Sequence, residues 1–287
     1  MLPWILGGAA VYGALVGGLY VLQDGLLFPR SVARVARYPL PPHAERLTLV
    51  SEDGERIVGH LVRAEGRSRG LVIGFPGNAW NADDYTVFLT QRLGDFDVAV
   101  FHYRGYAPSE GEPSERALFA DARLVHDTLV AGLRPRRVYA VGASLGSGVA
   151  AHLARARELD GVVLLTPFDS VFALARRRYP FVPVRWLLKH PFRSDLHLQG
   201  RDVPVALIAA SDDGVVPRAH TDALHRVLKR PVLYEIVEGT HSGLYDNPRF
   251  DPVLRRAMEA LERARTPRAA GARATVEAID LGRESTP

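Results

Sequence analysis

The stretch Gly142-Ala143-Ser144-Leu145-Gly146 decides the fold of this chain. It has the pattern G-x-S-x-G, it follows the apolar run from Arg137 to Val141, and it opens a helix-like segment that continues to Arg157. In this strand, turn and helix context the pattern predicts a nucleophile elbow, a tight turn that exposes the serine hydroxyl while the glycines keep neighbouring side chains clear. The alternative is a turn between a strand and a helix that is rich in small residues by chance. The choice depends on whether partners for Ser144 follow along the chain.

Two polar groups follow strand-like runs in the order acid and then histidine, as this fold requires after its nucleophile. The apolar run from Pro204 to Ala209 is followed by Asp213, and the run from Val232 to Val237 is followed by His241. Because ligands bind at the carboxyl edge of open α/β sheets, we expect both side chains to lie beside Ser144. Taken singly, Asp213 could cap a helix and His241 could be an ordinary loop histidine.

The residue types fit nucleophilic catalysis. A serine hydroxyl is a weak nucleophile near neutral pH, so Ser144 needs a base within hydrogen-bond reach, and His241 supplies a neutral imidazole. Asp213 would bind the other ring nitrogen, fix the tautomer and stabilise the imidazolium that forms. We prefer Asp213 to its neighbour Asp212, because its spacing to Val216-Pro217 places it at the turn before the next helix.

An oxyanion hole requires two N–H donors near the serine. The N–H of Leu145 lies at a helix start, where it has no partner within the helix. A second donor is expected after the apolar run from Gly70 to Phe75, which leads into Pro76-Gly77-Asn78, and the backbone N–H of Asn78 is our candidate. The alternative is a Pro-Gly turn that only starts a helix. These motifs predict neither a metal nor an organic cofactor.

Three motifs carry a resemblance to a known family. Phe75 to Asn81 is similar to F-H-G-N-A-x-N, Tyr103 to Glu115 is similar to Y-R-G-Y-G-x-S-x-G-x-P-S-E, and Asp213-x-x-Val-Pro217 also matches. The chain resembles the membrane-anchored α/β-hydrolase-domain serine hydrolases, whose relatives include depalmitoylating thioesterases and lysophospholipid or monoacylglycerol lipases. The resemblance covers residues 20 to 265 and implies the α/β-hydrolase fold, with a short cap insertion at about 168–201 that lines an acyl pocket or simply covers the core.

Two positions depart from the family pattern. Pro76 replaces a histidine and Ala107 replaces a glycine. Neither position carries a proton transfer, so the departures bear on the loop geometry beside the oxyanion hole and on substrate specificity. Within the longest motif we expect Arg104 to bind a nearby carboxylate or carbonyl group rather than substrate.

The amino end predicts a membrane anchor. Residues 2–23 contain no charged side chain, and about 20 apolar residues in a helix span the hydrocarbon layer of a bilayer. Trp4 and Tyr20 lie near the two ends, where amphipathic rings favour the interface. A cleaved secretory signal is disfavoured because no basic residue precedes the apolar run, and a helix packed on the protein's own domain is the other alternative. Basic residues after the segment place the catalytic domain in the cytoplasm by the positive-inside rule: Arg30, Arg34, Arg37 and Arg46.

Apolar runs alternate with helical stretches through the rest of the chain, which predicts an α/β fold with a mostly parallel sheet covered by helices on both faces. The expected strands are Leu47 to Ser51, Arg56 to Arg63, Leu71 to Phe75, Val98 to His102, Val138 to Val141, Val162 to Leu165, Val205 to Ala209 and Val232 to Val237. The predicted organisation is therefore an anchor at 1–23, a hydrolase domain at 24–265 and a flexible tail at 266–287.

Composition limits the possible partners. The formal net charge is +4, but the 36 basic residues include only two lysines, and no basic run is interleaved with aromatic residues in the manner of nucleic-acid binders. The chain has no cysteine, which excludes disulfides and a cysteine nucleophile and leaves the compartment open. The oligomeric state is not indicated by the sequence.

Together these features predict a membrane-anchored serine hydrolase that cleaves an acyl ester or thioester of a small molecule or lipid through an acyl-enzyme. An acyl-peptide or oligopeptide hydrolase is the alternative within the enzyme class. A catalytically silent membrane scaffold with the same fold is the alternative outside it.

Overall fold

The sheet at the centre of the molecule has eight strands in the order β1-β2-β4-β3-β5-β6-β7-β8. The computed structural model describes residues 2–264. β1 pairs antiparallel with β2 and β2 with β4, whereas all later pairs are parallel. Each strand lies within two residues of its predicted bounds: β1 Glu45–Val50, β2 Arg56–Val62, β3 Leu71–Phe75, β4 Asp97–Phe101, β5 Val138–Ala143, β6 Gly161–Leu165, β7 Val205–Ala210 and β8 Pro231–Val237.

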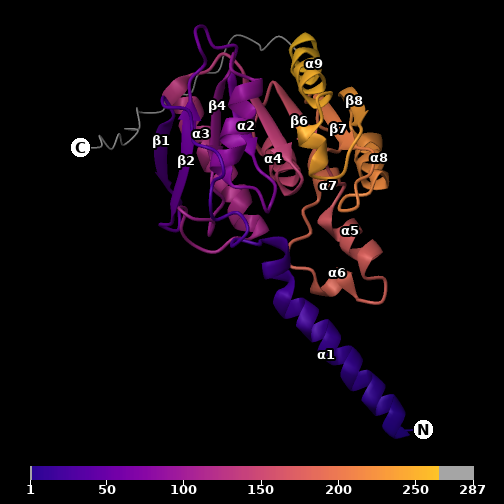
Figure 1. Cartoon of the computed structure of the whole chain (residues 1–287). Helices are drawn as coiled ribbons and strands as arrows, with labels where there is room; N and C mark the ends of the chain where they lie inside the picture. Colours follow the sequence, from indigo (N-terminus) through magenta and orange to yellow (C-terminus); the bar gives the residue numbers. More distant parts are fainter. Residues whose placement is uncertain (1, 265–287) are drawn as a thin grey trace.

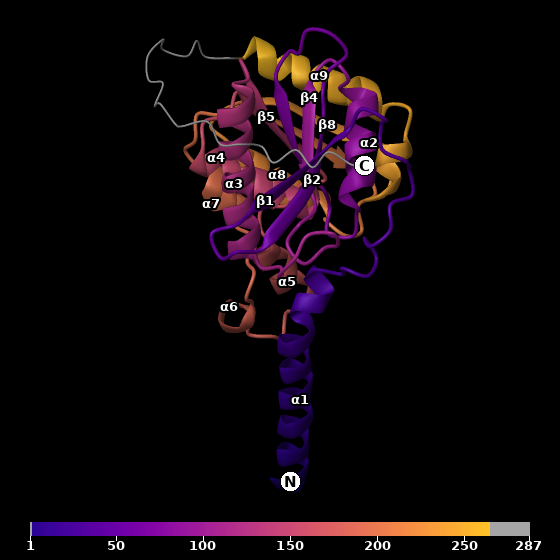
Figure 2. The ribbon, with the colours of Figure 1, turned by 90° about the vertical axis from the view of Figure 1, so that its left-hand side faces the viewer.

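Helices cover both faces of this sheet (Figure 1, Figure 2). α2 (Ala82–Arg92) and α9 (Phe250–Arg263) pack on one face, and α3 (Glu115–Leu133), α4 (Leu145–Ala156) and α8 (Arg218–Val227) pack on the other. Alternate residues of each strand enter the two cores, because successive strand side chains point to opposite faces. The inner strands are consequently apolar along their whole length, as expected for strands buried on both sides.

The first helix leaves the domain and projects away from it (Figure 1, Figure 2). α1 covers Leu2–Leu27, and its stretch Leu6–Leu27 is long and apolar enough to cross a membrane by length and composition. The helix continues past Gln23, where the predicted anchor ends, and includes Asp24, whose carboxylate lies 2.7 Å from Lys189 Nζ.

Three short helices lie between β6 and β7, inside the predicted cap range 168–201. They are α5 (Val171–Arg178), α6 (Val184–Leu187) and α7 (Ser194–Leu198). α5 and α6 lie at the end of the domain where α1 joins it (Figure 1). A 3-10 turn, η1 (Gly243–Asp246), links the end of β8 to α9. The predicted flexible tail at 266–287 lies outside the described residues.

Candidate active site

Ser144 lies on a sharp turn between β5 and α4 with φ 49° and ψ −116°, a conformation that L residues rarely adopt. Only glycine fits at position 146, two residues after Ser144, because a Cβ there would lie 2.0 Å from the carbonyl oxygen of Phe75. A Cβ on Gly142 would lie 2.3 Å from the carbonyl oxygen of Gly146. The Ser144 N–H donates to the carbonyl of Leu165 at 2.9 Å. The G-x-S-x-G pattern thus follows from close backbone approach, and it presents the serine side chain at the carboxyl edge of the sheet.

The structure brings Ser144, His241 and Asp213 into one hydrogen-bonded chain. His241 Nε2 lies 2.9 Å from Ser144 Oγ, and His241 Nδ1 lies 2.7 Å from Asp213 Oδ2. The Asp213 carboxylate is 3% exposed and the His241 side chain 15% exposed, so the inner end of the chain is shielded from water. A proton on Nδ1 bound to the carboxylate leaves Nε2 free to accept from the serine hydroxyl, which is the tautomer required of a general base.

The neighbouring acid has a different environment. Asp213 Oδ1 accepts hydrogen bonds from the N–H groups of Val215 and Val216 at 2.9 and 2.6 Å, which fix the orientation of its carboxylate. Asp212 is exposed, and its carboxylate accepts from the Ser211 hydroxyl at 2.7 Å. The geometry therefore places Asp213, and not Asp212, against the imidazole.

The loop after β3 lies beside the serine, as the position of a second oxyanion donor requires. A Cβ on Gly77 would lie 3.6 Å from Ser144 Cβ. The phenol of Tyr103 donates to the carbonyl of Pro76 at 2.8 Å, and the phenol of Tyr106 donates to the carbonyl of Asn78 at 2.9 Å. Leu145 is the first residue of α4, so its N–H has no partner inside the helix. That these N–H groups bind an oxyanion stays a prediction.

The motif that contributes these two tyrosines is held by ion pairs. Arg104 is 5% exposed and binds Asp121 through two nitrogens at 2.6 and 3.1 Å, and it also contacts the carboxylate of Asp53. These hydrogen bonds raise the pKa of Arg104 above its usual range despite its burial. Arg104 thus contacts carboxylates, as expected, and the motif braces the loop that carries Asn78.

Comparison with known proteins identifies the family. A family model described as the alpha/beta hydrolase fold matches residues 71–189. An uncharacterized protein of Mycobacterium tuberculosis is 31% identical over 243 residues, which are 83% of this chain and 86% of the relative. This chain belongs to the α/β-hydrolase family.

Other relatives of this hydrolase differ in extent. An uncharacterized membrane protein of Saccharomyces cerevisiae is 27% identical and covers 83% of this chain and 89% of that protein. A lysophosphatidylserine lipase of Danio rerio is 30% identical over 171 residues, which are 52% of this chain and 45% of the lipase. A Pyrococcus furiosus esterase has a TM-score of 0.65 at 17% identity, covering 80% of this chain and 97% of the esterase, which shows the fold alone. The family and its lipase relatives support a hydrolase.

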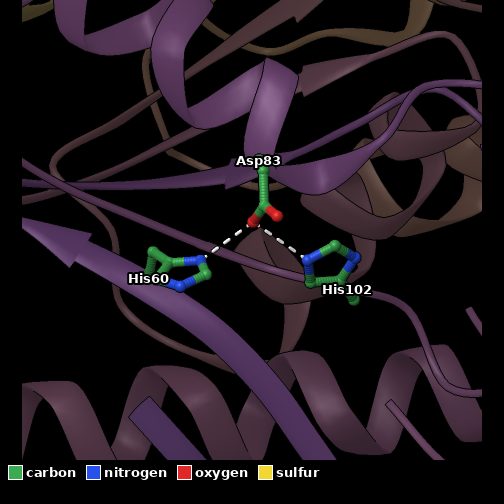
Figure 3. A group of neighbouring side chains, drawn as sticks. All are labelled: His60, Asp83 and His102. Atoms are coloured by element: carbon green, nitrogen blue, oxygen red, sulfur yellow. Dashed lines mark hydrogen bonds and ion pairs between the residues drawn. The ribbon is translucent and has the colours of Figure 1, made fainter. Parts of the chain in front are cut away.

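The hydrolase also contains a histidine and aspartate cluster that the sequence analysis missed (Figure 3). His60 Nδ1 and His102 Nε2 lie 2.9 and 3.0 Å from the same oxygen of Asp83. Burial raises the pKa of the Asp83 carboxyl, but the hydrogen bonds of His102 and His60 outweigh it and hold that pKa well below its usual range. No spacing rule could have found the cluster, since its members come from β2, the first turn of α2 and the residue after β4.

Imidazole nitrogens and a carboxylate are ligands that zinc accepts, and the three donor atoms of this cluster lie within 4.8 Å of one another. Hydrogen bonding to Asp83 already accounts for the arrangement. We therefore assign the cluster a structural role, because it ties β2 and the end of β4 to the start of α2, close to the loop that carries Asn78.

A groove of about 440 Å³ lies within the cap of the hydrolase. Its wall is formed by aromatic, apolar and arginine side chains of α5, α6 and the loop between them: Phe172, Arg176, Tyr179, Pro180, Val182, Pro183, Val184, Arg185 and Trp186. Ser144, Asp213 and His241 are not part of this wall. The insertion between β6 and β7 thus forms a concave surface whose lining does not include Ser144, Asp213 or His241.

Proposed function

We propose that this protein is a serine hydrolase that cleaves an acyl ester or thioester through a covalent intermediate. The observation that carries the proposal is the hydrogen-bonded chain from Ser144 Oγ through His241 to Asp213, buried at its inner end. Activation by an adjacent, oriented base is what a serine nucleophile needs. The arrangement meets that need with side chains from three separate strand ends.

In the proposed reaction Ser144 Oγ attacks the acyl carbonyl and passes its proton to His241 Nε2. The tetrahedral oxyanion is bound by the N–H groups of Leu145 and Asn78, which are worth most in a site shielded from water. Collapse of the intermediate breaks the bond to the leaving group, which takes the proton from His241. Water then attacks acyl-Ser144 with His241 as base again, releasing the acid and restoring the free serine.

We further propose that the acyl substrate is a lipid and that α1 anchors the enzyme in a membrane as a single span. Supporting observations are the apolar stretch Leu6–Leu27, the relative named as a membrane protein and the relatives named as lysophosphatidylserine lipases. By the positive-inside rule, the arginines that follow α1 support a catalytic domain on the cytoplasmic side.

Labelling by a fluorophosphonate probe tests the nucleophile directly. The full-length protein in mild detergent should be labelled, and Ser144→Ala should abolish labelling. Ser211→Ala is the matched control, because its exposed hydroxyl lies at the same sheet edge but contacts Asp212 instead of His241. A folded wild-type protein that resists the probe would favour a silent scaffold instead.

A substrate panel then tests the reaction class. Purified protein is assayed with p-nitrophenyl esters of rising chain length, lysophospholipids, acyl-thioesters and acyl-peptides. The proposal expects the highest kcat/KM among acyl esters or thioesters with long chains. Faster turnover of acyl-peptides would support an acyl-peptide hydrolase in its place.

A further inference from the structure

The cap of this hydrolase exposes an unusually apolar segment. Residues 179–188 read Tyr-Pro-Phe-Val-Pro-Val-Arg-Trp-Leu-Leu, in which Arg185 is the single charged residue. Phe181 is 86% exposed, Trp186 79% and Tyr179 39%. Large apolar side chains that are exposed together mark a binding surface, because soluble monomers rarely expose large contiguous apolar patches to water.

This segment runs alongside the proposed membrane anchor. The Tyr12 hydroxyl donates to the carbonyl of Phe181 at 2.8 Å, and at the other end Gln23 Nε2 donates to the carbonyl of Leu187 at 3.1 Å. The N–H of Lys189 in turn donates to Gln23 Oε1 at 2.9 Å. Tyr12 and Gln23 are eleven residues apart on α1. At a rise of 1.5 Å per residue, the cap segment accompanies the helix for about 16 Å.

The position of these contacts along α1 indicates whether water or lipid surrounds the segment. Tyr12 lies well inside Leu6–Leu27, the stretch that is long and apolar enough to span a bilayer. A cap loop that is hydrogen-bonded to Tyr12 must lie at the same depth in the membrane as that part of α1. About 16 Å corresponds to roughly half of a hydrocarbon layer of about 30 Å. The segment therefore reaches through one leaflet if α1 spans the membrane.

Charged groups adjoin both ends of this segment. Arg176, Arg177 and Arg178 end α5 just before the apolar segment, and Lys189 follows it and pairs with Asp24 at 2.7 Å. The Arg185 guanidinium lies 5.5 Å from the ring centre of Trp186, and its long side chain can extend toward the interface while its stem stays in an apolar layer. Lys189 lies beside Gln23 at the shallow end of the segment, where a basic residue favours the phosphates of anionic lipids.

We propose that the partner of this cap surface is the lipid bilayer, and that the segment 179–188 is embedded in the leaflet next to the catalytic domain. The proposal rests on the membrane anchoring put forward above. It also places the catalytic edge of the sheet against the membrane, because the side chain of Asn78, in the loop whose Gly77 lies beside Ser144, donates to the carbonyl of Leu27 at the end of α1 at 2.9 Å. Seven of the nine residues that line the groove of about 440 Å³ belong to this segment.

The absence of cysteine allows a direct test by site-specific probes in the full chain. Phe181→Cys, Val11→Cys and Arg67→Cys are each labelled with an environment-sensitive fluorophore and reconstituted into vesicles of phosphatidylcholine and phosphatidylglycerol. Val11 is an exposed residue within the apolar stretch of α1, and Arg67 is exposed in the loop between β2 and β3, at the opposite edge of the sheet. Thermal denaturation of each variant confirms that it is folded.

The expected result is that the probes at 181 and 11 emit at shorter wavelength, are quenched by nitroxide-labelled lipids and resist aqueous iodide, whereas the probe at 67 shows the reverse. A probe at 181 that iodide quenches as strongly as the one at 67, while the probe at 11 reports lipid, would overturn the embedded cap and leave the anchor standing. If the probes at 11 and 181 are both accessible to iodide, the anchoring itself fails and the embedded cap fails with it.

Discussion

At the scale of single residues, the backbone of Ser144 is the most constrained feature of the candidate site. A positive φ at a residue other than glycine costs on the order of 1–3 kcal/mol and persists only where the surroundings impose it. Here the Ser144 N–H is bound by Leu165 O, and its carbonyl accepts from the Ser147 hydroxyl at 2.6 Å. Hydrogen bonds thus hold the backbone of Ser144 on both sides of its Cα, so its hydroxyl is already positioned to meet His241.

Ser144→Ala and His241→Ala should each lower turnover by several orders of magnitude and leave the melting temperature nearly unchanged. The double variant should be no slower than the worse single variant, because residues that act as one unit lose their effect together. Initial rates on a p-nitrophenyl ester, with thermal denaturation alongside, measure both quantities. A double variant much slower than either single one would argue against a shared role.

Asp213→Asn should lower kcat by up to ~10⁴-fold, because an amide at this position favours the wrong imidazole tautomer. Asp212→Asn is the matched control and should be mild, since the exposed Asp212 carboxylate bonds to Ser211. Kinetics of the two variants on the same ester decide between the acids. The reverse ranking would assign the orienting role to Asp212.

At the scale of elements, the tight junction of β3, β5 and α4 positions the serine. Gly146→Ala would drive a Cβ to 2.0 Å from the Phe75 carbonyl oxygen and should destabilise the fold by about 3 kcal/mol or more, the upper end for overpacking. Gly214→Ala is the control, because no heavy atom lies within 4 Å of its Cβ position. Chemical denaturation compares the two variants, and equal midpoints would contradict the proposed close packing.

A pair of histidines between α4 and α7 should make the fold sensitive to acid. Burial lowers the pKa of His152 to about 3 and that of His197 to about 4; His197 and nearby arginines lower the pKa of His152 further, and nearby arginines lower that of His197. Histidines of the unfolded chain titrate near pH 6.5, so between about pH 6.5 and 4 the unfolded state binds more protons. Stability is therefore full above that range and falls as the pH drops through it.

His197→Phe, which keeps a ring against Phe119 and His152, should flatten this loss of stability. Melting temperatures measured between pH 4.5 and 8 test the effect. His43→Gln replaces an exposed histidine and should leave the slope as in the wild type. An unchanged slope in His197→Phe would show that the acid sensitivity arises elsewhere.

The elements were predictable from the sequence to the extent that they depend on local pattern. The strands and the helix after Ser144 follow from apolar runs between turn residues, and G-x-S-x-G specifies its turn through glycines that no other residue could replace. Contacts between distant segments leave no such local pattern. The His60, Asp83 and His102 cluster and the bond from Tyr12 to Phe181 depend on tertiary packing alone, and the sequence analysis found neither.

At the scale of the whole molecule, α1, the segment 179–188 and the loop beside Ser144 are connected by hydrogen bonds. α1 forms hydrogen bonds to the cap through Tyr12 and Gln23, and to the loop beside Ser144 through the carbonyl of Leu27. Exposed apolar side chains lie along α1 and on the cap segment 179–188. The proposed span and the proposed embedded cap would hold the catalytic edge at the membrane surface, and each makes a separate contribution to membrane affinity.

The full-length protein should therefore stay in the membrane fraction after washing with high salt and with alkaline carbonate. Buried apolar area is not screened by ions, whereas attraction through surface arginines is. A truncated protein that starts at Asp24 should detach largely and keep its esterase activity, since every proposed catalytic residue lies beyond Phe75. Phe181 and Trp186 should give it a residual affinity for vesicles that Phe181→Glu with Trp186→Glu removes. Release of the full-length chain by salt alone, or loss of an N-terminal peptide from the mature protein, would contradict a spanning anchor.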